Sequence, residues 1–106
     1  MAYRVDMRDI YFNLFEVLGI DKLSEFEAFK DFSADDYKMI LTEAEKLAVN
    51  VIAPTLAITD KHGAKFVGGK VVVPEVIGET LRKYNEGGWG AMGASPQFPR
   101  SNSAAL

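Results

Sequence analysis

The chain has 106 residues, of which 48% are hydrophobic and 25% are charged, and it contains no cysteine. This length suits one small domain, and the lack of cysteine excludes disulfides, thiolate metal sites and cysteine nucleophiles. The 12 Lys and Arg residues and 15 Asp and Glu residues give a net charge of −3, and the basic residues are scattered. This balance argues against nucleic-acid binding, which needs clustered positive charge.

The N-terminal sequence MAYRVDMRDIYF lacks the basic region and apolar stretch of a signal peptide. No part of the sequence approaches the run of about 18 apolar residues that a transmembrane helix needs. We therefore expect a soluble, cytoplasmic protein without a membrane span.

The first predicted element is a helix over residues 6–18, with Asp6 as its cap and Gly19 at its end. Its i, i+3, i+4 stripe consists of Met7, Ile10, Tyr11, Leu14 and Leu18. Phe12, Phe15 and Val17 widen the apolar face well beyond one stripe. Such a helix is either buried in the core or docked on another domain or subunit.

Residues 20–32 are less regular and predict a short helix or tight loop, in which Phe26, Phe29 and Phe32 serve packing. The strongest helix covers residues 34–53, where an amphipathic stripe follows a capping box of Ser33 and Asp36. Pro54 ends or kinks this helix.

The segment Asp60-Lys61-His62-Gly63 predicts a turn. Gly68-Gly69 between Lys65–Val67 and Lys70–Val73 predicts a two-residue β-hairpin turn. A third long helix covers residues 75–86, with Pro74 in its first turn and Gly87 as its left-handed terminating residue. Its predicted buried face is Val76, Ile77, Leu81 and Tyr84.

These elements predict a mainly α fold, namely a small helical domain of three long helices plus a short helix and one β-hairpin. The last residues, SPQFPRSNSAAL, show no periodicity and predict a loop or disordered tail.

One glycine-rich run, Gly88-Trp89-Gly90-Ala91-Met92-Gly93, matches the G-x-G-x-x-G spelling of a dinucleotide-binding loop. Such a loop must follow a strand and open a helix, whose N-terminus holds the pyrophosphate. Here the glycines follow a predicted helix, so we interpret the run as a helix-ending turn that lets Trp89 fold back onto the core.

Other side chains with catalytic or metal-binding potential lack a supporting pattern. His62 is the sole histidine and lies in a predicted exposed turn, which excludes a two-histidine metal site. The carboxylates show no sign of the contrasting environments that an acid–base pair needs; they are Asp35, Asp36, Glu43, Glu45, Glu75 and Glu79. We assign no catalytic, cofactor-binding or metal-binding residue.

Six short patterns in order resemble the N-terminal part of an acyl-CoA dehydrogenase, over residues 3–98. They are Asp6-Met7-Arg8 through Gly19, Glu43-Ala44-Glu45 through Ala53-Pro54, Asp60 with Gly63, the hairpin, the Pro-led helix, and Gly87-Gly88-Trp89. The resemblance is strongest to the larger subgroup with an N-terminal extension, which includes enzymes acting on methylthiopropanoyl-CoA.

The resemblance implies an all-α N-terminal domain that precedes a β-barrel and a helical bundle in a homo-oligomeric enzyme. The full enzyme would use FAD to oxidise an acyl-CoA thioester to the 2-enoyl-CoA and pass electrons to an electron-transfer flavoprotein. The family's flavin contacts and catalytic glutamate lie mainly in the later domains. No functional residue is therefore carried over, and this chain alone is expected to be inactive and to hold no cofactor.

The likeness stops after Phe98, where the family would continue with a second glycine-rich turn. We interpret residues 1–98 as the N-terminal domain, with 1–32 as its extension segment, and 99–106 as a disordered tail outside the family pattern. A truncated coding sequence or a shifted reading frame would explain the change. The alternative is a standalone helical interaction module that uses the apolar face of its first helix and has no enzymatic activity.

Overall fold

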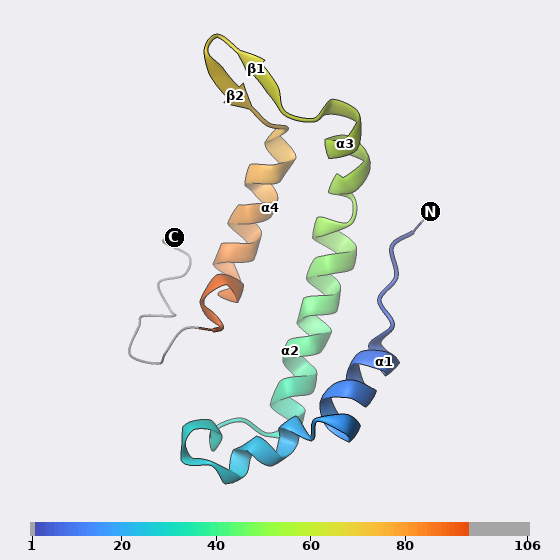
Figure 1. Ribbon diagram of the computed structural model, residues 1–106, viewed down its shortest axis with the longest axis vertical. Coiled ribbons are helices and arrows are strands. Elements are labelled where there is room, and N and C mark those ends of the chain that lie inside the picture. Colours follow the sequence, from blue (N-terminus) through green and yellow to red (C-terminus); the bar gives the residue numbers. More distant parts are fainter. Residues whose placement is uncertain (1, 94–106) are drawn as a thin grey trace. The chain divides into compact units, whose positions relative to one another are not determined.

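The computed structural model describes residues 2–93, which form helices and one two-stranded sheet (Figure 1). In chain order the elements are α1 (Met7–Tyr11), η1 (Phe12–Val17), η2 (Ile20–Glu25), η3 (Glu27–Phe29), α2 (Ala34–Lys46), η4 (Leu47–Ile52), α3 (Thr55–His62), β1 (Lys65–Val67), β2 (Lys70–Val72), α4 (Glu75–Glu86) and η5 (Trp89–Ala91). The predicted mainly α fold with a β-hairpin is confirmed.

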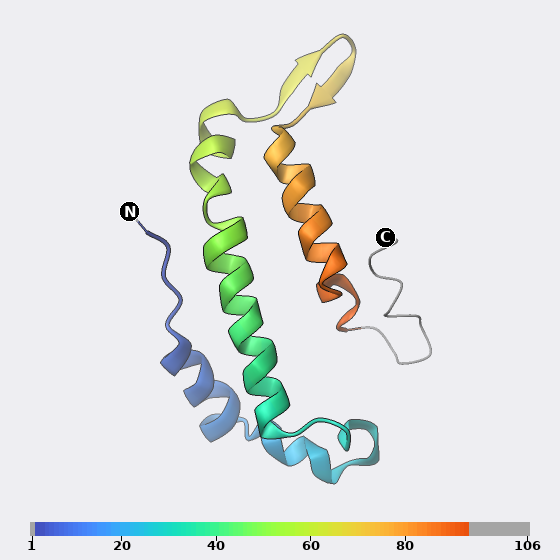
Figure 2. The same cartoon turned by 180° about the vertical axis from the view of Figure 1, so that it is seen from behind.

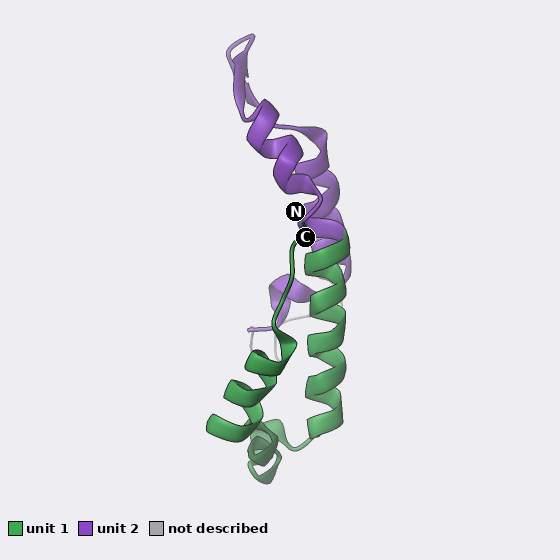
Figure 3. Cartoon of the chain, turned by 90° about the vertical axis from the view of Figure 1, so that its right-hand side faces the viewer, with its two compact units in different colours: residues 1–50 green, residues 51–106 purple. Residues whose placement is uncertain are grey.

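The chain divides into two compact units, residues 1–50 and 51–106 (Figure 3). In the first unit, α1 contacts η1, and η2 contacts both η1 and α2. In the second unit, α4 contacts both α3 and η5. The predicted domain of residues 1–98, its extension over 1–32 and the disorder of 99–106 stay predictions; residues 94–106 lie outside the described part.

The first predicted helix has the expected ends but not the expected winding. Asp6 caps it by accepting a 3.1 Å hydrogen bond from the Asp9 amide, and Gly19 ends it with φ of 62°. Its second half, η1, is a π-helix, with the Leu18 amide bonded to the carbonyl of Asn13. The wider turn changes which side chains share a face, so the predicted stripe does not continue to Leu18, which is 70% exposed.

Residues 20–32 contain the two 3₁₀ turns η2 and η3, in agreement with the predicted short helix or tight loop. The predicted packing role of the three phenylalanines is not met in the described fold, because Phe26, Phe29 and Phe32 are all exposed. Phe32 makes one aromatic contact, a stacked one with Tyr37 at a centroid distance of 6.1 Å.

The predicted capping box at the start of α2 is present. The Asp36 amide donates to Ser33 Oγ at 3.3 Å, and the Ser33 amide donates to Asp36 Oδ2 at 2.8 Å. The helix continues through the π-helix η4 up to Pro54, as predicted from the sequence. Pro54 then precedes another helix, α3, which the sequence pattern did not predict.

The predicted turn over Asp60-Lys61-His62-Gly63 is therefore wrong in its first three residues, which form the last turn of α3. Gly63, with φ of 58°, ends the helix. Local hydrogen bonds support this short helix, because Thr59 Oγ1 donates to the carbonyls of Thr55 and Leu56. The eight residues carry no amphipathic stripe, so periodicity gave no sign of them.

The hairpin forms as predicted, with β1 antiparallel to β2 and Val67 paired with Lys70 across the turn. Gly68 and Gly69 have φ of 58° and 80°, the two positive values that a type I′ turn requires. The hairpin joins α3 to α4 along the chain (Figure 2).

The helix α4 has the predicted bounds, but two details differ. Gly87 has an ordinary φ of −76°, and the left-handed residue is its neighbour Gly88, with φ of 80°. On the predicted buried face, Val76, Ile77 and Tyr84 are half-buried, whereas Leu81 is 54% exposed.

Within residues 2–93, no hydrophobic side chain is fully buried, so neither unit has a closed core of its own. Large apolar side chains are instead exposed along most elements, including Val17 at 60%, Leu56 at 72% and Phe66 at 75%. Apolar surface left open on this scale is typical of a region that other polypeptide covers.

Candidate functional site

The glycine-rich run lies at the carboxyl end of α4. Gly88 is left-handed and leads into η5, a single 3₁₀ turn that brings Trp89 back against Gly87. A dinucleotide loop has the opposite order, with a strand before it and a long helix after it. The negative end of a helix dipole also disfavours phosphate. The run therefore does not fit the pyrophosphate of FAD or NAD.

His62 is the last residue of α3 and is exposed. Within residues 2–93 no three His, Asp or Glu side chains come together as metal ligands could. No helix in the described part is both long enough and apolar enough to cross a bilayer.

The carboxylates considered for acid–base chemistry lie on two helices: Asp35, Asp36, Glu43 and Glu45 on α2, and Glu75 and Glu79 on α4. Glu43 pairs with Lys46 at 2.9 Å, and Glu45 lies half-buried on the same helix. Asp36 accepts hydrogen bonds from the Ser33 amide and hydroxyl, which lower the pKa of its carboxyl below the ordinary value of 3.8. This shift follows from helix capping.

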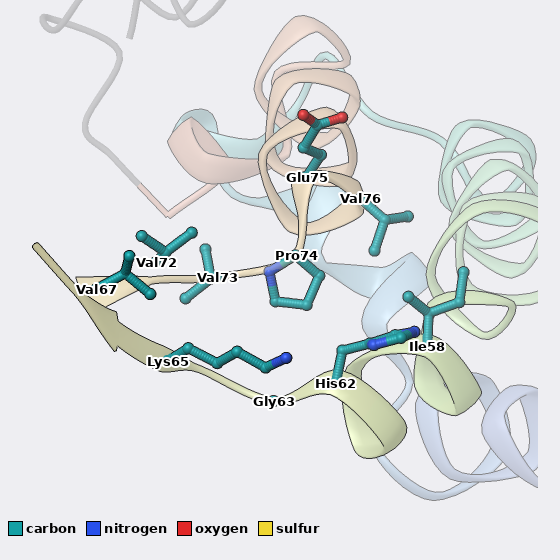
Figure 4. Close-up of a pocket in the computed structure, with 10 residues that line it drawn as sticks. All are labelled: Ile58, His62, Gly63, Lys65, Val67, Val72, Val73, Pro74, Glu75 and Val76. Atoms are coloured by element: carbon teal, nitrogen blue, oxygen red, sulfur yellow. The ribbon is translucent and has the colours of Figure 1, made fainter. Parts of the chain in front are cut away.

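One open groove lies wholly in the second unit, between α3, the hairpin and the start of α4 (Figure 4). Its volume is about 440 Å³, and its lining residues are Ile58, His62, Gly63, Lys65, Val67, Val72, Val73, Pro74, Glu75 and Val76. Three valines gather at the hairpin end, and the Lys65 amino group reaches toward His62. The floor is apolar, with few polar groups.

Sequence reasoning missed this groove because its residues come from three elements, one of which was not predicted. Only the hairpin part of the groove could have been anticipated from the sequence. The strand register puts Lys65 opposite Val72 and Val67 opposite Lys70, so these four residues share one face of the hairpin. Phe66 and Val71 share the other face.

A second hollow lies wholly in the first unit and was also not predicted. It is lined by Arg8, Tyr11, Phe12, Phe15, Glu16, Asp21, Ala34 and Lys38. Tyr11 and Phe15 pack with ring centroids 5.9 Å apart, and Lys38 Nζ lies 5.5 Å from the centroid of Phe15. These contacts hold the end of α1 and η1 against the start of α2 by aromatic and cation–π attraction.

The chain is similar in sequence to several curated acyl-CoA dehydrogenases. It is 33% identical over 86% of its length to the broad-specificity linear acyl-CoA dehydrogenase FadE5 of Mycobacterium tuberculosis. It is 35% identical over 91% of its length to a butyryl-CoA dehydrogenase of Syntrophomonas wolfei. It is 27% identical over 84% of its length to the 3-methylmercaptopropionyl-CoA dehydrogenase of Ruegeria pomeroyi.

The chain spans about 15% of the length of these relatives. No protein-family model matches it, and no solved structure does. The predicted resemblance to acyl-CoA dehydrogenases, including those acting on methylthiopropanoyl-CoA, is thereby confirmed.

Proposed function

We propose that this chain, which is related by sequence to the acyl-CoA dehydrogenases, is the N-terminal helical domain of such an enzyme. The proposal depends on one observation. The sequence similarity covers about nine-tenths of this chain but only 16% of the butyryl-CoA dehydrogenase, which is about six times longer. The open apolar surface of both units also supports it, because a domain from a larger protein has faces that other domains cover.

The full enzyme would oxidise an acyl-CoA thioester to the 2-enoyl-CoA with FAD and pass electrons to an electron-transfer flavoprotein. We place it in the cytoplasm, as a homo-oligomer. The family resemblance supports these features, and the relatives' names support the acyl-CoA substrate.

The chain's own part in this enzyme would be structural. It would cover part of the acyl and flavin cleft and support subunit packing, while flavin binding and proton abstraction belong to later domains. The geometry of the glycine-rich run supports this division, because Gly88 to Gly93 follow a helix and do not fit a flavin pyrophosphate.

The purified chain tests the inactivity directly. We expect no visible flavin absorbance after reconstitution with FAD and no dye reduction with butyryl-CoA. Bound flavin or turnover would show that the chain carries chemistry of its own.

The gene tests the fragment interpretation. Sequencing beyond codon 98 should show, in one of the reading frames, coding for a β-barrel domain and a helical bundle. Downstream DNA that lacks such coding in every frame would remove this interpretation.

A second candidate function is a standalone interaction module without enzymatic activity. The exposure of Phe12, Val17 and Leu18 on the first helix, at 50%, 60% and 70%, favours it, because these side chains could dock on a second copy. Size-exclusion chromatography with light scattering distinguishes the two. A concentration-dependent dimer lost in Leu18→Asp would support the module, and a monomer at high concentration would count against it.

A further inference from the structure

We infer that the groove of the second unit is a docking site for an apolar segment, bearing one carboxylate, from the later part of the full-length polypeptide. This inference rests on the proposed function and names the surface through which the chain would be joined to the rest of the enzyme.

The groove presents a continuous apolar strip. Val67 and Val72 come from the hairpin, and Val73 and Pro74 continue the strip to the start of α4. Val67, Val72 and Val73 remain 59%, 50% and 46% exposed. An isolated two-stranded hairpin is marginally stable in water, so an occupant that buries these valines would also stabilise the strands.

The polar groups of the groove indicate the charge of its occupant. The described ion pairs are those of Lys30 with Glu27, Lys46 with Glu43 and Arg82 with Glu86, so Lys65 has no carboxylate partner within residues 2–93. Glu75 also lines the groove, but its carboxylate points away from the Lys65 amino group (Figure 4). An Asp or Glu on the occupant would complement Lys65 as the groove is dehydrated.

The comparisons favour further polypeptide over a free ligand as the occupant. About 85% of each relative lies outside the matched segment, because the chain spans only 15% to 16% of their lengths. The groove is open, and its apolar strip runs from the hairpin to the start of α4. A small-molecule site encloses most of its ligand, whereas a strip of this form suits an element of another domain.

A chimera tests the inference. The aligned segment of the Syntrophomonas butyryl-CoA dehydrogenase is replaced by residues 1–98 of this chain, and the melting midpoint is measured. Val72→Asp, in the groove, should lower the melting midpoint by about 2–4 °C or more, because it would bury a charge where the occupant contacts the groove. Val71→Asp is the matched control, since Val71 is 71% exposed on the opposite hairpin face and does not line the groove.

Two charge-reversal variants test whether the occupant of the groove carries a carboxylate. Lys65→Glu should lower the midpoint, whereas Lys70→Glu, on the same hairpin face but outside the groove lining, should change it by less than about 1 °C. In the isolated chain all four variants should keep the helix content of the unmodified chain, since each side chain is exposed there.

The outcomes separate the two proposals. A folded chimera without bound flavin, under conditions where the parent enzyme holds it, would overturn the proposed function and the docking site with it. A flavin-containing chimera in which Val71→Asp and Val72→Asp have equal effects would overturn the docking site alone. Equal effects of Lys65→Glu and Lys70→Glu would overturn the acidic occupant.

Discussion

The indole of Trp89 lies directly against the backbone of Gly87, so that a Cβ atom built at position 87 would fall 2.8 Å from Trp89 Nε1. Side-chain carbons do not approach other atoms this closely, and Gly87 has an ordinary φ of −76°. Position 87 therefore favours glycine because of the neighbouring ring and not because of its backbone conformation.

Gly87→Ala should consequently displace Trp89 from the end of α4. Trp89 is the sole tryptophan, so its fluorescence emission should move toward that of a solvated indole. Because Trp89 is only half-buried, the loss of unfolding free energy should not exceed about 1 kcal/mol. Unchanged emission would contradict the described packing of the ring.

Gly78→Ala provides the opposite case on the same helix. A Cβ atom at position 78 meets nothing within 4 Å, and the residue lies inside α4. Alanine should therefore raise the stability of α4 by about 0.5–1 kcal/mol through helix propensity alone. Far-UV circular dichroism during urea unfolding measures the effect, and a lower midpoint would contradict the placement of position 78 in open space.

The hairpin turn should discriminate between substitutions at Gly68, whose φ is 58°. Gly68→Asn should preserve the turn, since Asn-Gly is a preferred type I′ pair. Gly68→Val should destabilise it by roughly 1–2 kcal/mol, because a β-branched residue is strained in the left-handed region. NMR contacts between Phe66 and Val71 report the register, and their survival in the valine variant would argue against a type I′ turn.

The capping box predicts a pH dependence of α2. Hydrogen bonds from the Ser33 amide and hydroxyl lower the pKa of Asp36 below 3.8. Because the folded pKa is depressed, the stabilisation is fully present above the unfolded value and is lost as the pH falls through the folded value. Ser33→Ala removes the hydroxyl bond and keeps the backbone amide bond, so an NMR titration should show the Asp36 pKa moving only part of the way up toward 3.8. An unchanged pKa in that variant would refute the hydrogen bond from the Ser33 hydroxyl, which is the bond that this substitution removes.

Elements with an explicit end signal were predictable from the sequence. Ser33 with Asp36 located the start of α2, and Gly68-Gly69 located the hairpin, because capping and turn geometry depend on neighbouring residues alone.

Features that depend on winding or on packing between elements were not predictable. The change from α to π winding at Phe12 leaves no mark in an i, i+3, i+4 pattern, and α3 has no stripe to detect. The left-handed residue at the end of α4 was predicted to be Gly87 but is Gly88. The two glycines are adjacent, so the sequence did not distinguish between them. The groove joins α3, the hairpin and α4, so only the folded second unit reveals it.

Turnover of butyryl-CoA by the unmodified chimera tests most directly the claim that this chain is the N-terminal domain of an acyl-CoA dehydrogenase. We expect a flavin-containing enzyme that reduces an electron-accepting dye with butyryl-CoA, while the isolated chain does neither. A folded chimera that holds no flavin and shows no turnover, under conditions where the parent enzyme does both, would contradict it.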